Sequence, residues 1–234
     1  MTRDFLRYLG PLRPLAKRAA TLCFPRYSWL LDRLNWEARL KATVKEFPSA
    51  IEVGSREDLC WYLSETLLDK GNRAIDYLEF GVFEGASIRF WNAANQNASS
   101  RFFGFDSFEG LPEDWHSGKK KGAFSTRGKL PQIGDPRVSF VAGWFQKSLR
   151  GFMASYHPQG QLVIHVDCDL YSSTLYCLTT LDPVISPGTL IVLDDFFDAL
   201  HVYRALMDYC SANMRAYKLL AHTHELGQAA ILML

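Results

Sequence analysis

The chain has 234 residues, of which 48% are hydrophobic and 22% charged, with a formal net charge of +1 at pH 7. This balance is typical of a soluble globular domain with one sizeable core, and it excludes the strongly basic footprint of a nucleic-acid-binding protein. The five cysteines are odd in number and lack metal-ligand spacing, which indicates reduced thiols and a cytoplasmic protein. No apolar run approaches the roughly 20 residues that a membrane span requires.

The first 26 residues carry six basic side chains against one acid, Asp4, with leucines and aromatics between them. Pro11, Pro14 and Arg18 interrupt every apolar run, so this segment is not a secretory signal. A basic amphipathic segment could lie on an anionic membrane surface. We expect instead a cap of short helices over residues 1–54, without membrane contact, whose charges are solvated.

From residue 55 onward the pattern is regular. Ser55 is a predicted N-cap, with Asp58 three residues on, for a helix over residues 55–68. Strands are predicted at 74–80, 101–105, 138–142, 161–166, 189–193, 217–221 and 229–234, and helices at 84–95, 148–156, 173–181 and 200–212. This alternation predicts an α/β fold for residues 55–234: a doubly wound, Rossmann-like sheet of seven strands, mostly parallel, with an antiparallel last strand.

Two of these strands end in pairs of acids. Asp167 and Asp169 follow one continuous apolar run, and Asp194 and Asp195 follow the next. If the two strands are neighbours, four carboxylates meet at the carboxyl edge of the sheet, where open α/β folds bind ligands. Such crowding raises the pKa of each carboxyl group unless a cation neutralises the charge. We therefore favour a cation site over the alternative, in which these acids cap the helices that follow.

The earlier strand ends indicate a nucleoside site. Gly81 and Gly85, at a strand–helix junction, let a ligand approach the backbone, although Phe83 stands where the three-glycine dinucleotide fingerprint has its second glycine. Asp106 ends the second strand and could accept hydrogen bonds from both ribose hydroxyls, or it could cap its own turn. Trp144 follows the third strand and could face an adenine ring or belong to the core.

Four segments together resemble the class I S-adenosylmethionine-dependent methyltransferases. The nearest resemblance is to the macrocin O-methyltransferase family, which acts on sugars of macrolides and related natural products. The match covers roughly residues 55–200 and rests on YLEFGVFEG at 77–85, GFDSFEGLP at 104–112, HVDCDLYSST at 165–174 and PGTLIVLDD at 187–195. The order of these four motifs along the chain is that of the family.

This resemblance implies S-adenosyl-L-methionine as the cofactor. In that family the first strand-turn holds the methionine part, the acid after the second strand holds the ribose, and the turn after the third strand lies near the adenine. The cofactor-binding residues implied here are Glu79, Phe80, Gly81, Gly85, Asp106, Ser107, Gly143, Trp144 and Asp167.

The resemblance also implies a magnesium ion. Members of the sugar branch bind Mg²⁺ through an acid of the fourth strand and the acid pair of the fifth, which implies Asp167, Asp194 and Asp195 here. Asp169 is then the implied general base, and the roles of Asp167 and Asp169 could be exchanged. His201 is a further catalytic candidate, or else a plain surface residue.

Other features of the sequence qualify this assignment. His165 lies in an apolar strand, and we expect it to be a core histidine. The lysine-rich segment 117–122 is either a solvated loop tip or a lid. Many relatives continue from the fifth strand with Asp-Glu-Tyr and later a His-Glu pair, whereas this chain has Asp194-Asp195-Phe196 and His201-Val202. This difference leaves the cofactor assignment intact and makes the acceptor less certain.

The expected function is metal-assisted O-methylation of a hydroxyl on a sugar or natural-product acceptor, a small molecule, by a protein that could be a homo-oligomer. A hard cation held by oxygen ligands can polarise the hydroxyl, which is otherwise a poor acid. Alternatives within the class are a metal-independent enzyme or a catechol or phenol O-methyltransferase. Alternatives outside it are an NAD-dependent oxidoreductase and a non-catalytic Rossmann-like partner protein.

Overall fold

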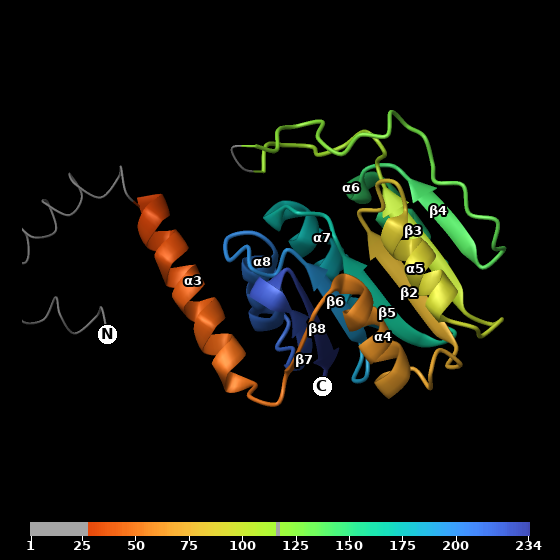
Figure 1. Ribbon diagram of the computed structural model, residues 1–234. Helices are drawn as coiled ribbons and strands as arrows, with labels where there is room; N and C mark the ends of the chain where they lie inside the picture. The colour runs from red at the N-terminus through yellow and green to blue at the C-terminus, as the bar shows by residue number, and fades with distance from the viewer. Residues whose placement is uncertain (1–27, 116–117) are drawn as a thin grey trace, which may run out of the picture.

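The computed structural model describes residues 28–115 and 118–234, and predictions that concern residues 1–27 lie outside this part of the chain. Its strands form one sheet (Figure 1), with the order β1-β7-β8-β6-β5-β2-β3-β4. Their bounds are β1 Ile51–Val53, β2 Ile75–Phe80, β3 Arg101–Asp106, β4 Val138–Ala142, β5 Gln161–Val166, β6 Leu190–Asp194, β7 Tyr217–Thr223 and β8 Gln228–Met233.

The topology confirms the predicted doubly wound α/β fold. All neighbouring strands pair in parallel except β8, which runs antiparallel between β6 and β7. The seven predicted strands are all present. The eighth, β1, was not predicted, because it has three residues and exposes Ile51 on the edge of the sheet, too short a run for any periodicity.

Helices cover both faces of the sheet and create two cores (Figure 1). One core packs under α4 (Arg56–Leu67) and α5 (Ala86–Ala94), the other under α6 (Phe145–Met153), α7 (Tyr171–Leu181) and α8 (Val202–Ala212). Two short 3₁₀ turns, η2 (Asp182–Val184) and η3 (His224–Leu226), complete the elements after α7 and β7. The helix α4 starts as predicted, because the Ser55 hydroxyl accepts a hydrogen bond of 3.0 Å from the Asp58 amide.

The N-terminal segment was predicted to form several short helices, but its described part contains one long helix. Residues 28–46 form a single helix of 19 residues, α3 (Ser28–Glu46), beside α8 (Figure 1). Trp36 packs edge-on against Tyr203 of α8, whose hydroxyl is 2.8 Å from Thr43 Oγ1. The domain boundary at residue 54 stays a prediction. Within the described ranges, no helix combines the length and the apolar run that crossing a bilayer would require.

A buried ion pair fixes the amino ends of the central strands, opposite the edge with the acid pairs. Asp76 of β2 is fully buried, and the Arg101 guanidinium of β3 donates to both of its carboxylate oxygens, at 2.9 and 2.5 Å. The Tyr156 hydroxyl and the Gln159 amide donate to the same carboxylate, each at 2.9 Å. This carboxylate is therefore fully satisfied, as a buried charge must be.

Replacement of Arg101 by methionine should destabilise the protein by roughly 3 kcal/mol, because removal of one partner leaves a buried charge only partly compensated. Urea unfolding followed by circular dichroism measures this. The control is Arg33→Met, which breaks the exposed Arg33–Glu37 pair of α3 and should cost less than about 0.5 kcal/mol. Equal losses in the two variants would contradict the importance of the buried pair.

Candidate active site

A cavity of about 500 Å³ opens at the carboxyl ends of the parallel strands, the edge where such sheets bind ligands. Its volume suits a small molecule or a nucleoside cofactor. Eight of the predicted site residues line it: Gly81, Asp106, Ser107, Trp144, Asp167, Asp169, Asp194 and Asp195. Five others, although described, are not part of its lining: Glu79, Phe80, Gly85, Gly143 and His201.

The turn after β2 lies against the end of β5. Gly81 has a φ of +92°, and a Cβ at this position would lie 1.8 Å from the carbonyl oxygen of Asp167. No side chain fits there, so glycine is required both by the backbone conformation and by the close approach. The turn continues to Gly85, which caps α5 in a left-handed conformation.

Asp106 holds this turn in place from the end of β3. Its Oδ2 accepts hydrogen bonds of 2.8 Å from the amides of Val82 and Phe83, and its Oδ1 accepts one of 2.7 Å from the amide of Phe108. Both sequence interpretations meet here, since Asp106 caps its own turn and also lines the cavity. A carboxylate has about four acceptor positions, so three amides leave capacity for one ribose hydroxyl.

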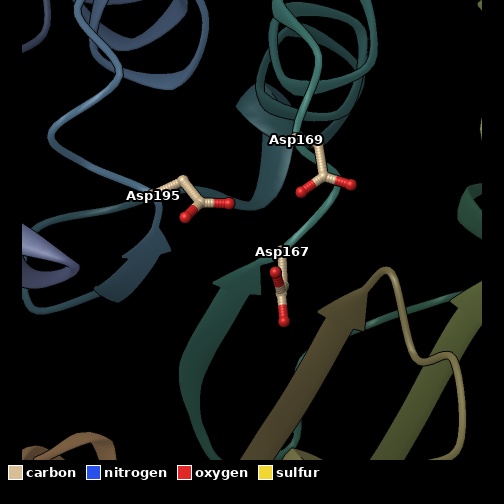
Figure 2. Close-up of side chains that lie close together, drawn as sticks. All are labelled: Asp167, Asp169 and Asp195. Atoms are coloured by element: carbon tan, nitrogen blue, oxygen red, sulfur yellow. The ribbon is translucent and has the colours of Figure 1, made fainter. Parts of the chain in front are cut away.

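The acid pairs come together as the sequence predicted. Figure 2 shows the carboxylates of Asp169 and Asp195 facing one another from the loops after β5 and β6, with Asp167 beside them. Burial and the Asp195 carboxylate raise the pKa of Asp169, and the Lys119 ammonium partly offsets this rise. Burial also raises the pKa of Asp167 to about 7.

Both loop acids adopt an unusual backbone conformation. Asp169 has a φ of +59° and Asp195 a φ of +48°, in the left-handed region that is uncommon for residues other than glycine, although aspartate adopts it more often than most. Such strain persists only where the surrounding structure enforces it, and it is concentrated at functional sites. The conformation turns both carboxylates toward the cavity that they line.

A group of three acids could hold a metal ion. Asp167, Asp169 and Asp195 each offer one oxygen, and these oxygens lie within 4.8 Å of one another. The implied set instead contained Asp194, which is buried beside Asp167 and lies 2.8 Å from the guanidinium Nη1 of Arg56. Three carboxylate oxygens are the ligands that Mg²⁺ prefers, so the residues present fit this ion.

Arg56 was not predicted as a site residue, although it lines the cavity beside Asp194. It stands at the first position of α4, and nothing in its local sequence distinguishes it from a solvated arginine. Burial and the Asp167 carboxylate raise the pKa of Asp194 to about 9, and the Arg56 guanidinium opposes this rise. Arg56 is thus the resident counter-charge of the more buried acid pair.

The two histidines have different environments. His165 is buried, as predicted, and burial lowers its pKa to about 3, with a further contribution from Arg56. His201 precedes α8, and its Nδ1 accepts a hydrogen bond of 3.2 Å from the amide of Tyr171, at the start of α7. In this position His201 satisfies a helix N-terminus from outside the cavity lining.

The long segment between β3 and β4 contributes one wall of the cavity through Leu111, Trp115 and Phe124. Two side-chain contacts tie it to the opposite rim. The Trp115 indole donates to Asp198 at 3.0 Å, and Ser172 donates to Glu113 at 2.7 Å. Both tethers come from residues just before the lysine-rich segment 117–122, whose role as a lid stays a prediction.

The fold and the cavity define a Rossmann-like α/β protein with a nucleoside-sized site bordered by clustered acids. A family model described as "Methyltransferase domain" matches residues 78–196, just over half of the chain. The chain belongs to this methyltransferase family, which confirms the resemblance and favours methyl transfer over the NAD-dependent alternative.

Two curated relatives are O-methyltransferases by name. An 8-demethyl-8-(2,3-dimethoxy-alpha-L-rhamnosyl)-tetracenomycin-C 4'-O-methyltransferase of Streptomyces olivaceus is 35% identical over 175 residues, 64% of this chain and 65% of the relative. A demethyldecarbamoylnovobiocin O-methyltransferase of Streptomyces niveus is 30% identical over 160 residues, 57% and 59% of the two chains. The chain thus spans less than two thirds of each relative.

Solved structures share the fold. The O-methyltransferase NovP has a TM-score of 0.58 at 22% identity, over 86% of this chain and 98% of its own. The calicheamicin methyltransferase CalS11 has a TM-score of 0.57 at 17% identity, over 98% and 90%. An O-methyltransferase from Bacillus cereus in complex with SAH has a TM-score of 0.51 at 15% identity, over 94% and 97%.

The raised pKa of Asp169 predicts how stability depends on pH when metal is chelated. The folded protein keeps a proton on this carboxyl group up to about pH 8, whereas the unfolded chain releases it near pH 4. Unfolding therefore releases a proton between these values, and stability should fall as the pH rises from 5 to 8.

Urea unfolding in chelator should show that Asp169→Asn removes part of this decline, so that its stability relative to wild type increases toward pH 8. Asp114→Asn is the control, because Asp114 is an exposed acid whose pKa is lowered by the Lys121 amide and by Lys120, and it should run parallel to wild type. A constant difference between Asp169→Asn and wild type over this range would refute the raised pKa.

Proposed function

We propose that the protein is an S-adenosylmethionine-dependent O-methyltransferase that methylates a hydroxyl group on the sugar of a glycosylated natural product, with a divalent cation bound. The observation that carries this proposal is the joining of two features in one cavity: the Gly81 turn held by Asp106, and the acid cluster of Asp167, Asp169 and Asp195. The first suits a nucleoside cofactor, and the second suits activation of a hydroxyl beside it.

Methyl transfer is a displacement in which the hydroxyl oxygen forms a bond to the methyl carbon as the bond from carbon to the sulfonium sulfur breaks. The sulfonium departs as a neutral thioether, so the protein has to align the two reactants and remove one proton. Alignment alone can supply roughly 7–11 kcal/mol of the barrier. The close backbone contact between Gly81 and Asp167 supports such alignment, because it joins the cofactor turn to the acid loop.

Asp169 is the proposed general base. It lines the cavity, its backbone conformation directs it toward Asp195, and its raised pKa gives the carboxylate a greater affinity for a proton than an ordinary aspartate has. The proton removed from the acceptor would rest on this carboxyl group until solvent takes it. The Asp195 carboxylate, which contributes to the raised pKa of Asp169, would favour that proton transfer.

Magnesium is the proposed metal, held by Asp167, Asp194 and Asp195, which leaves Asp169 as the base. The cluster of Asp167, Asp169 and Asp195 also allows the exchanged roles, with Asp169 as a ligand and Asp167 as the base. When bound, a divalent cation polarises the acceptor hydroxyl and lowers its pKa. Vicinal hydroxyls of a sugar suit such a site, because two neighbouring oxygens can approach the same group of carboxylates.

The acceptor class rests on the relatives. The curated names describe O-methylation of a rhamnosyl tetracenomycin and of demethyldecarbamoylnovobiocin by those proteins. Trp115 and Phe124 on the lid and Trp144 below it provide flat apolar surface around the acids, which suits a sugar attached to an aromatic aglycone. We also propose a cytoplasmic location, because Cys60, Cys168, Cys177 and Cys210 are buried free thiols. A homo-oligomeric state stays a prediction.

The cofactor assignment predicts that S-adenosylhomocysteine binds with micromolar or tighter affinity and that Asp106→Ala weakens it at least tenfold, about 1.4 kcal/mol. Loss of this carboxylate removes the ribose acceptor and releases the amides of Val82 and Phe83. Calorimetry measures both affinities. Asp135→Ala is a matched control, because Asp135 joins Arg137 and Asn92 elsewhere on the protein surface, and unchanged binding by Asp106→Ala would place the ribose elsewhere.

The catalytic assignment predicts that demethyldecarbamoylnovobiocin or a rhamnosylated tetracenomycin gains one methyl group from S-adenosylmethionine in the presence of Mg²⁺, and that chelator abolishes this. Asp169→Asn should reduce the rate by roughly 10²–10⁴, the usual loss for a general base, while S-adenosylhomocysteine affinity is retained. Product mass spectrometry and calorimetry measure the two effects. Asp114→Asn should keep full activity.

Full activity in excess chelator would overturn the metal-assisted mechanism. A simple catechol, tested in parallel, distinguishes the acceptor classes: turnover of the catechol without turnover of either glycoside would replace the sugar by a phenol as the acceptor.

A further inference from the structure

A strip of buried polar side chains crosses the face of the sheet under α4. Tyr77 and Glu79 project from β2, His165 projects from β5, and Gln228 projects from β8, and all four are at most 3% exposed. Glu79 pairs in register with His165, and Gln228 pairs with Asp194. The strip therefore crosses the sheet from β2, which leads to the Gly81 turn, over β5 and β6 to β8, where Gln228 lies beside Asp194.

The hydrogen bonds along this strip run in one direction. Gln228 Nε2, which can only donate, is 3.3 Å from His165 Nε2, so this ring nitrogen accepts. The neutral imidazole then carries its hydrogen on Nδ1, which lies 2.6 Å from the Tyr77 hydroxyl. Tyr77 in turn donates its hydrogen to Glu79 Oε2 at 2.5 Å. Each donor is used once, and the chain ends on the carboxylate.

The other oxygen of this carboxylate is different. Within the part of the chain that the structure describes, Glu79 Oε1 is buried and has no hydrogen-bond partner. Burial raises the pKa of Glu79, the Tyr77 hydroxyl opposes this rise, and the carboxylates of Asp106 and Asp194 raise it further. Both of those acids line the cavity, and so does Gly81, two residues after Glu79, although Glu79 itself is not part of the lining.

We propose that Tyr77, His165 and Gln228 are positioning residues that orient Glu79, so that its Oε1 receives the ammonium group of the cofactor's methionine moiety. This inference rests on the proposed function. By occupying Oε2 with a donor that is itself held by two further side chains, the strip fixes the rotation of the carboxylate and leaves a single oxygen for the cation. An isolated buried Glu79 would have no such preference.

If the strip only stabilised the sheet, its loss would not affect a ligand with an ammonium group differently from one without it. The experiment therefore compares two such ligands. Calorimetry compares S-adenosylhomocysteine with its analogue in which hydrogen replaces the α-amino group. Tyr77→Phe keeps the ring that stacks on Trp91 at 5.2 Å and removes the hydroxyl. This variant should bind S-adenosylhomocysteine at least tenfold more weakly, the effect of a lost hydrogen bond to a charged group. Its affinity for the deaminated analogue should change less than twofold.

Gln228→Met is the second variant and removes the donor at the far end of the strip. It should also reduce the ratio of the affinity for S-adenosylhomocysteine to the affinity for the deaminated analogue, but by a smaller factor than Tyr77→Phe does. The matched control is Tyr156→Phe, which deletes another hydroxyl bonded to a buried carboxylate, that of Asp76 at the amino ends of the strands. This control should leave the ratio of the two affinities unchanged.

Equal weakening of both ligands by Tyr77→Phe and by Gln228→Met, or no change for either ligand, would overturn the positioning role. Should Tyr77→Phe fail to fold, the affinity ratio of Gln228→Met decides the question in the same way. If the wild-type protein binds neither ligand, the proposed function fails instead, so the two failures are distinguishable.

Discussion

The structure depends on carboxylates held at one edge of a parallel sheet at separations where like charges repel. Asp167 and Asp194 form one pair, and Asp169 and Asp195 form another. Each acid follows directly from a buried strand, so the backbone cannot move these groups apart without breaking the sheet. Folding therefore leaves a concentrated negative charge that protons, the Arg56 guanidinium or a metal ion must compensate. This cost is typical of a site maintained for function rather than for stability.

The fold was largely predictable because its strands are long, apolar and bounded by glycine or proline. Strands β5 and β6 are buried on both faces, and their continuous runs of Val, Ile and Leu identified them without ambiguity. Strand β1 was not predicted, because three residues are too few to show the alternation of apolar and polar side chains that marks a strand. The described part of the first fifty residues forms one helix, α3, where prolines suggested several; within the described part, Pro48 lies beyond the end of that helix.

The acids of the candidate site were predictable for a related reason, since their position at strand ends follows from the strands. The residues that support them were not. Arg56 comes from a helix more than a hundred residues away from Asp194, and only tertiary structure brings them within 2.8 Å. Tyr77 and Gln228 looked like ordinary strand residues. Their period-two spacing from Glu79 and Ala230 places them on a particular face, but their contacts with His165 join side chains from three strands, β2, β5 and β8.

The contact of Gly81 with Asp167 has a consequence for how such a protein can diversify. Two loops, one for the cofactor and one carrying the acids, touch through backbone atoms alone. In the proposed reaction, the spacing between methyl donor and activated oxygen therefore depends on this backbone contact, together with the Asp106 side chain that holds the turn. The segment between β3 and β4 instead reaches the opposite rim through side chains, so we expect replacements there to alter the choice of acceptor more than the contact between the two loops.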